Sequence, residues 1–204
     1  MTVRQNIETE FDIISCGISN DSSKILLVLQ EDDENYIIQQ NSTDDLKMNF
    51  THRLEGVYIK AKEIIQNKDG SIFLCPYLNN GVFKLLIFDH EKVLLDYNIN
   101  EAIGLDDKTR PNDNFPDPFV NACFVDDGDK IFINCFHSRE LMLHHFIFSR
   151  VKNMIDSPIV KTKLPESTRN FPLSSYFDDE KQFVYIFFRQ GESFMINLQE
   201  LKRV

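Results

Sequence analysis

Four segments of this chain share one form, a polar turn that leads into an apolar strand. They read NDSSKILLVL, NKDGSIFLCPY, DDGDKIFINCF and DDEKQFVYIFF. The first apolar residues of these strands are Ile25, Ile72, Ile131 and Phe183, at intervals of 47, 59 and 52 residues. A unit of this size cannot bury its apolar faces alone, so repeats near this length indicate units that stack on one another. The repeat therefore constrains the fold more than any other feature.

We call Ile25, Ile72, Ile131 and Phe183 the anchors, and the strand that each begins an anchor strand. Each anchor strand is accompanied by further apolar stretches that are separated by turns. The expected strands before the anchors are 13–18, 57–65, 119–125 and 172–177; those after them are 36–39, 83–88, 141–148 and 193–198; a fourth set is 48–54, 92–99 and 151–155. Asn80-Gly81 predicts a tight hairpin, because both central positions of a type I′ turn need positive φ. The nearest approach to helical periodicity, Asn98–Asp107, is short. We therefore expect antiparallel strands and little helix.

The pattern predicts one all-β domain over residues 1–204. The expected units cover about 11–55, 56–101, 118–158 and 169–204, with longer connections at 101–117 and 156–172. The last unit has three expected strands where the others have four, so the prediction is a β-propeller of about four antiparallel blades, in a closed or an incomplete ring. An antiparallel β-sandwich or barrel is the alternative, since many short strands also suit that class.

The segment Asp126–Phe136, DDGDKIFINCF, resembles the aspartate-glycine turn and following strand of WD-repeat and YVTN-type propellers. NKDGSIFLCPY shares this form. The Gly-His and Trp-Asp dipeptides of WD repeats are absent, and Phe88-Asp89 is the one dipeptide that is similar to Trp-Asp. The resemblance implies blades that pack on both neighbours, which explains why the strand after each turn is apolar on both faces.

The net charge of the chain indicates which classes of partner it can bind. There are 22 Lys and Arg against 32 Asp and Glu, which gives a net charge of −10. Phosphate backbones attract basic proteins, so we expect no direct contact with nucleic acid. No apolar run approaches the roughly 20 residues of a membrane-spanning helix, and the first residues resemble neither a secretory signal nor a transit peptide. We expect no membrane insertion, no secretion and an intracellular location, cytoplasmic or nuclear.

The cysteines and histidines give weak signals for metal. Cys16, Cys75, Cys123 and Cys135 lie in apolar stretches without a CxxC motif, which favours buried, unlinked thiols. The densest group of potential ligands is Cys135, His137, His144 and His145. Its spacing matches no recognised zinc pattern, and the expected hairpin places His144 nearer Asn134. We therefore predict no metal, catalytic or cofactor site there.

Two other groups of polar residues contain side chains that can carry chemistry. Asp126, Asp127 and Asp129 surround Gly128 but lack the spacing of an EF-hand, so a turn is the preferred interpretation. A propeller hydrolase, lactonase-like and with an axial metal, would draw on residues such as Glu34, Asp89, His90 and His137. No GxSxG, GxGxxG or GxxxxGK[ST] motif is present, so we expect no enzyme and no cofactor.

The preferred functional interpretation is a non-enzymatic scaffold for protein–protein interaction, or a subunit of a larger complex. A protein partner or a second copy would complete the sheet or ring, with Phe187, Phe188 and Phe194 near the contact. The alternative is that the residues around Val3 supply the missing fourth strand and close a four-bladed ring. The acidic connection 101–117 is a candidate docking loop for a basic partner. The alternatives are the propeller hydrolase and a fragment or half of a larger propeller. The strand at 183–188 is apolar on both faces, so both faces need cover.

Overall fold

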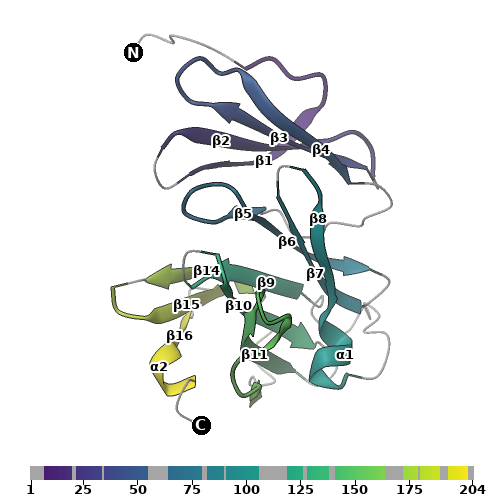
Figure 1. The fold of residues 1–204 in the computed structure, drawn as a ribbon. Helices are drawn as coiled ribbons and strands as arrows, with labels where there is room; N and C mark the ends of the chain where they lie inside the picture. Colours follow the sequence, from purple (N-terminus) through teal and green to yellow (C-terminus); the bar gives the residue numbers. More distant parts are fainter. Residues whose placement is uncertain are drawn as a thin grey trace.

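The computed structural model describes residues 7–19, 22–33, 35–54, 64–79, 82–89, 91–105, 119–125, 128–137, 141–163, 172–178, 180–188 and 193–201. Within them the chain forms four antiparallel sheets in chain order, A to D. Figure 1 shows sheet A at the top, sheet B below it, and sheets C and D beside each other in the lower half. The stacked units that the repeat predicts are therefore present.

Sheets A and B are simple meanders, in which each strand pairs with the next. Sheet A contains β1 (Asp12–Ile18), β2 (Lys24–Gln30), β3 (Tyr36–Ser42) and β4 (Met48–Leu54). Sheet B contains β5 (Ile65–Gln66), β6 (Phe73–Asn79), β7 (Val82–Phe88) and β8 (Val93–Asn98). Asn79 pairs with Val82, which confirms the predicted hairpin, although Asn80 and Gly81 themselves lie outside the described residues.

Sheets C and D depart from this plan at their outer edges. Sheet C contains β9 (Phe119–Phe124), β10 (Lys130–His137), β11 (Met142–Ser149), β12 (Met154–Ile155) and β13 (Val160–Lys163). Sheet D contains β14 (Pro172–Asp178), β15 (Phe183–Phe188) and β16 (Ser193–Asn197). Both β12 and β13 pair with β11, so a strand occupies part of the connection predicted at 156–172. Among the described residues, sheet D has no fourth strand.

Two short helices follow outer strands. Helix α1 (Ile99–Ile103) lies within the predicted near-helical stretch, and α2 (Leu198–Leu201) follows β16. The Asn98 side chain caps α1 by accepting a hydrogen bond from the Glu101 amide, and Gly104 ends the helix at φ 68°. The buried Asn100 side chain accepts a bond from the Phe83 amide at 2.8 Å, which fixes α1 to β7.

Three apolar cores separate the four sheets, because each inner strand buries side chains on both of its faces. Between A and B, the rings of Phe73 and Phe88 stack with centroids 5.2 Å apart, and His52 of β4 stacks on Phe88. The cores between B and C and between C and D are also rich in Ile, Leu and Phe. No described core joins sheet D to sheet A.

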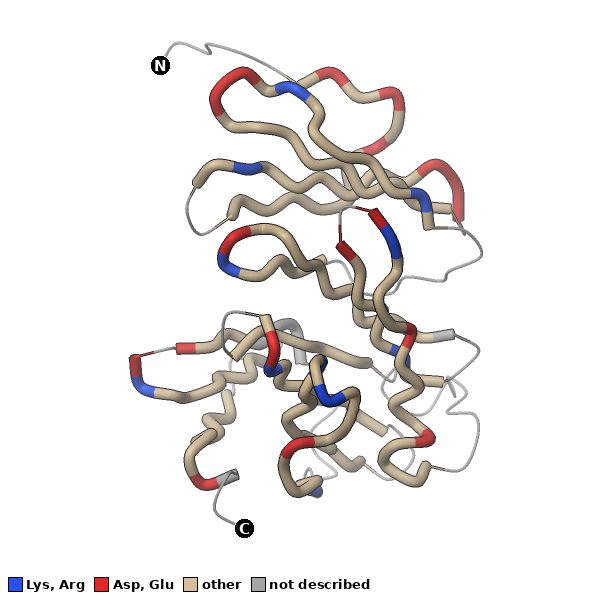
Figure 2. Tube along the Cα trace, in the orientation of Figure 1, with Lys and Arg blue, Asp and Glu red and all other residues tan. Residues whose placement is uncertain are grey.

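The turns carry most of the charge. Figure 2 shows the acidic residues gathered mainly in turns, while the strands are largely uncharged. Gly70 and Gly128 occupy the predicted glycine turns at φ 69° and 119°. At the second of these turns, Asp129 accepts hydrogen bonds from the Ser149 hydroxyl and the Val151 amide. Asp129 therefore joins this turn to the turn that follows β11, and the segment around Gly128 is a turn, as predicted.

Candidate functional site at the open end of the stack

The outer face of sheet D carries a group of exposed apolar side chains. Alternation along β15 turns Val184 and Ile186 toward sheet C, where both are fully buried. Phe183, Tyr185 and Phe187 lie on the opposite face. Their rings form a ladder with centroids 6.5 and 6.4 Å apart. No described sheet covers this ladder.

Neighbouring strands extend the same face. Tyr176 of β14 and Met195 of β16 both pair with Tyr185, so all three side chains share the outer face. Tyr176 is 61% exposed, Met195 59% and Phe187 42%. Exposed apolar side chains that are contiguous in this way mark interaction surfaces, whereas single ones are ordinary. We call Tyr176, Phe183, Tyr185, Phe187 and Met195 the outer D face.

At the other end of the stack, sheet A also presents an apolar outer face. Ile13, Ile18 and Met48 are more than half exposed on it, and the exposed Cys16 lies in the same face. At its centre, Leu27 and Leu29 are buried. The exposed part of this face is therefore its margin, whereas the outer D face is exposed on its central strand as well, at Phe187.

The three predicted interface residues do not share one surface. Phe187 lies on the outer D face. Phe194 pairs with Ile186 and packs into the core between sheets C and D, so it points the opposite way. The backbone of Phe188 ends β15, and its side chain lies outside the described residues. The structure thus places Phe187 and Phe194 on opposite sides of sheet D.

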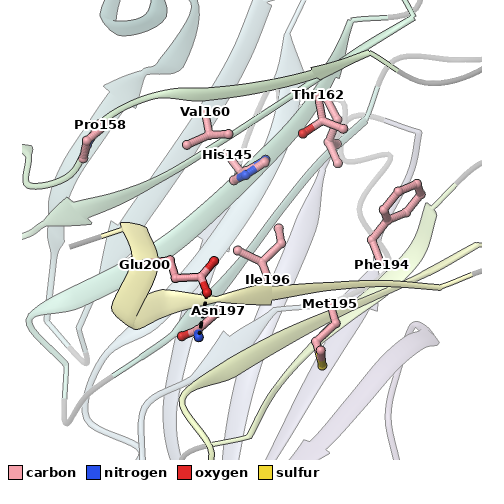
Figure 3. Close-up of a pocket in the computed structure, with 10 residues that line it drawn as sticks. His145, Pro158, Val160, Thr162, Phe194, Met195, Ile196, Asn197 and Glu200 are labelled. Carbon is pink, nitrogen blue, oxygen red and sulfur yellow. Dashed lines mark hydrogen bonds between the residues drawn. The ribbon is translucent and has the colours of Figure 1, made fainter. Parts of the chain in front are cut away.

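A cavity of about 360 Å³ lies between β11 and β13 of sheet C and β16 of sheet D. Most of its lining is apolar, and its residues are Leu143, His145, Pro158, Val160, Thr162, Phe194, Met195, Ile196, Asn197 and Glu200. Figure 3 shows the His145 ring between Val160 and Ile196, with Glu200 beside Asn197. Sequence reasoning did not find this cavity, because its walls come from strands far apart in the chain.

A row of polar side chains crosses sheet C and ends at this cavity. Asn121 of β9 pairs with Asn134 of β10, which pairs with His145 of β11. Asn134 is 0% exposed and His145 is 5% exposed. Both polar atoms of Asn134, the Asn121 amide nitrogen and His145 Nδ1 have no hydrogen-bond partner among the described residues. Buried polar atoms of this kind are rare and point to water or a ligand.

The predicted metal candidates divide between the two faces of sheet C. Cys135 pairs with His144, and Asn134 pairs with His145, so the predicted register was wrong by one residue. Cys135 faces sheet B, whereas His145 faces sheet D. Burial raises the pKa of the Cys135 thiol and, together with the His144 charge, lowers that of His145 to about 4. The described residues contain no cluster of three or more His, Cys, Asp or Glu placed to hold a metal.

The remaining candidates occupy turns or fall outside the described residues. Asp89 accepts hydrogen bonds from the amides of Glu91 and Lys92 in the β7–β8 turn. Glu34, His90, Asp126 and Asp127, and most of the acidic connection at 101–117, lie outside the described residues. No helix in the described part of the chain is both long and apolar enough to cross a membrane.

The cysteine prediction is confirmed in one respect and wrong in another. All four thiols are free, as expected. Cys16 is exposed, because it lies on the outer face of the first sheet, whereas burial was expected for all four. Burial raises the pKa of Cys75 to about 12, so this thiol stays protonated.

No family model and no curated protein sequence matches this chain. Solved structures do. The WD40 domain of Toxoplasma gondii coronin superposes with a TM-score of 0.58 at 12% identity, over 86% of this chain and 40% of that chain. The β-propeller domain of Myceliophteria thermophila Cps50 (Swd1) gives 0.56 at 7% identity, over 91% of this chain and 50% of that chain.

This chain has a β-propeller fold. Its four sheets are therefore propeller blades. The predicted propeller is confirmed, and the alternative of a sandwich or barrel is wrong. The periplasmic gluconolactonase PpgL of Pseudomonas aeruginosa, an enzyme by its name, also matches, with a TM-score of 0.54 at 11% identity over 91% of this chain and 49% of that chain. The chain spans about half the length of the solved propellers it matches, and the likeness shows the fold alone.

Proposed function

We propose that this protein is a non-enzymatic interaction module, a partial propeller whose outer D face is covered by another protein. The observation that carries the proposal is the exposure of Tyr176, Phe187 and Met195 together on one sheet face. Burial of apolar surface contributes roughly 25 cal/mol per Å², so contiguous rings in water favour association. The free thiols support an intracellular location as part of the proposal.

A second copy of the chain is the partner that the geometry favours. The chain covers about half of a solved propeller domain, for example 50% of Swd1. Two such arcs together contain eight blades, which is within the usual range of four to eight. The outer D face of one copy would lie on the exposed margin of sheet A of the next, around Ile13, Ile18 and Met48. This contact repeats the sheet-on-sheet order of A on B, B on C and C on D.

Photo-crosslinking tests the proposed surface. We would place a benzophenone amino acid at Tyr185, in the aromatic ladder, and at Val151 as the control. Val151 is 71% exposed but lies in the turn between β11 and β12. We expect protein adducts from Tyr185 and few from Val151. The mass of the adduct distinguishes a second copy from a different protein, and equal yields from both positions would contradict the proposal.

A further inference from the structure

Within the described residues, the third strand of sheet D, β16, has no outer neighbour, unlike the third strands of the other three sheets. The third strand of sheets A, B and C is covered by β4, by β8 and by β12 with β13. In the described residues, β16 pairs with β15 alone. Alternate residues of a strand direct their backbone N–H and C=O groups to opposite edges, so an unpaired edge presents a row of donors and acceptors.

The cavity runs along this free edge. Four consecutive residues of β16, Phe194 to Asn197, line it. Successive side chains of a strand point to opposite faces, so a cavity that touches all four must follow the strand's edge rather than one face. The far wall is formed by Val160 and Thr162 of β13, with His145 between the two sheets.

The chemistry of the cavity selects a side chain that is apolar with one polar tip. Leu143, Val160 and Ile196 supply apolar walls, while His145 Nδ1 is buried without a described partner. A phenol fits this combination, because its hydroxyl can donate or accept and its ring is apolar. Among the described residues of the lining, Glu200 is the one with a charged side chain, so a neighbouring basic residue would be attracted.

The fourth strand of sheet B, β8, places a tyrosine ring against the next sheet in the same way. Tyr97 of β8 contacts Phe148 of β11 with ring centroids 4.4 Å apart. We propose that β16 and the adjoining cavity bind an extended segment of another protein, which adds as the fourth strand of sheet D and inserts a tyrosine beside His145. This contact lies at the edge and inner side of sheet D. Of the outer D face only Met195 lines the cavity, and the rings of the aromatic ladder do not.

Selection from a heptapeptide library displayed on phage, with the full chain as target, tests the proposal. Synthetic peptides from the enriched sequences are then titrated. We expect one shared tyrosine, a nearby Lys or Arg, and a loss of about three- to tenfold in affinity when that tyrosine becomes phenylalanine. In the His145→Phe variant the preference for tyrosine over phenylalanine should disappear. Val151→Ser, in the β11–β12 turn and outside the cavity lining, should keep it.

Methylating backbone amides of the peptide is a second test, in which the protein itself is not changed. Methylating the amides on one set of alternate peptide residues should abolish binding, and methylating the other set should not. The proposal is overturned if no sequence is enriched, if both methylated peptides bind equally, or if His145→Phe retains the tyrosine preference. The crosslinking from Tyr185 reads the opposite face, so either result can fail alone.

Discussion

The rings of Tyr185 and Phe187 stack on the outer face of β15 with their centroids 6.4 Å apart and their planes at 19°. On the inner face of the same strand, Val184 and Ile186 are fully buried against sheet C. One strand therefore carries a closed apolar face and an open one. In sheets A and C, the second strand buries most of its apolar side chains. Because β15 leaves one apolar face exposed, we propose that another protein chain covers this face.

The glycine turns give a test of backbone conformation. Gly104 has φ 68° and nothing within 4 Å of an added Cβ, whereas at Gly128 a Cβ would lie 3.2 Å from Asn67 and 3.3 Å from Ile72. We expect Gly104→Ala to lower the free energy of unfolding by about 1 kcal/mol through positive φ alone. Gly128→Ala should cost roughly 2 kcal/mol, since crowding adds to the strain. Urea denaturation measures both, and equal losses would contradict the crowding at Gly128.

Asn100 tests how helix α1 is held. Its side-chain oxygen accepts a buried hydrogen bond from the Phe83 amide, while the Asn98 side chain accepts a solvent-exposed one from the Glu101 amide at 3.3 Å. Asn100→Ala leaves a buried donor without a partner, and we expect a loss of about 2 kcal/mol. Asn98→Ala should cost about 1 kcal/mol or less. A smaller effect at Asn100 than at Asn98 would show that the bond to β7 contributes little.

His145 makes stability depend on pH. Its pKa in the folded protein is about 4, below the ordinary 6.5, because burial disfavours the charged ring. Below pH 6.5 the unfolded chain takes up a proton that the folded chain does not, so the free energy of unfolding falls as the pH drops from 6.5 toward 4. The full effect is about 3 kcal/mol. His145→Phe should flatten this part of the profile, to which the partly buried His52 contributes in the same direction.

The thiols should differ in reactivity. Cys16 is exposed, whereas Cys75, Cys123 and Cys135 are buried. With a thiol reagent such as dithionitrobenzoate, we expect one thiol per folded chain to react quickly and all four to react in denaturant. Cys16→Ser should remove the fast phase alone. A fast phase of two or more thiols, or a disulfide in unreduced protein, would contradict the burial pattern.

Much of the fold could be predicted because turn chemistry and two-sided apolar strands repeat locally. The anchors Ile25, Ile131 and Phe183 lie at the start or within the first two residues of β2, β10 and β15. Strand β13, with the sequence VKTK, has half its positions charged and was missed. The exposure of Cys16 was also missed, since an end sheet and an inner sheet have the same local pattern.

The candidate site depends on contacts that no local pattern encodes. His145 and Ile196 line one cavity although they are distant in sequence. The expected pairing of His144 with Asn134 assumed a shorter connection than the one observed, in which His137 pairs with Met142. Phe194 was grouped with Phe187 by composition, and alternation in β15 and β16 separates them.

Light scattering on the purified full chain at low micromolar concentration tests the central claim most directly. We expect a mass of twice 23.9 kDa, because the outer D face of each copy would be covered by the other. Phe187→Glu should convert the pair to monomers, while Val151→Glu, on an exposed turn of sheet C, should not. A stable 23.9 kDa monomer that binds no hydrophobic dye would contradict the claim that this face is a contact surface.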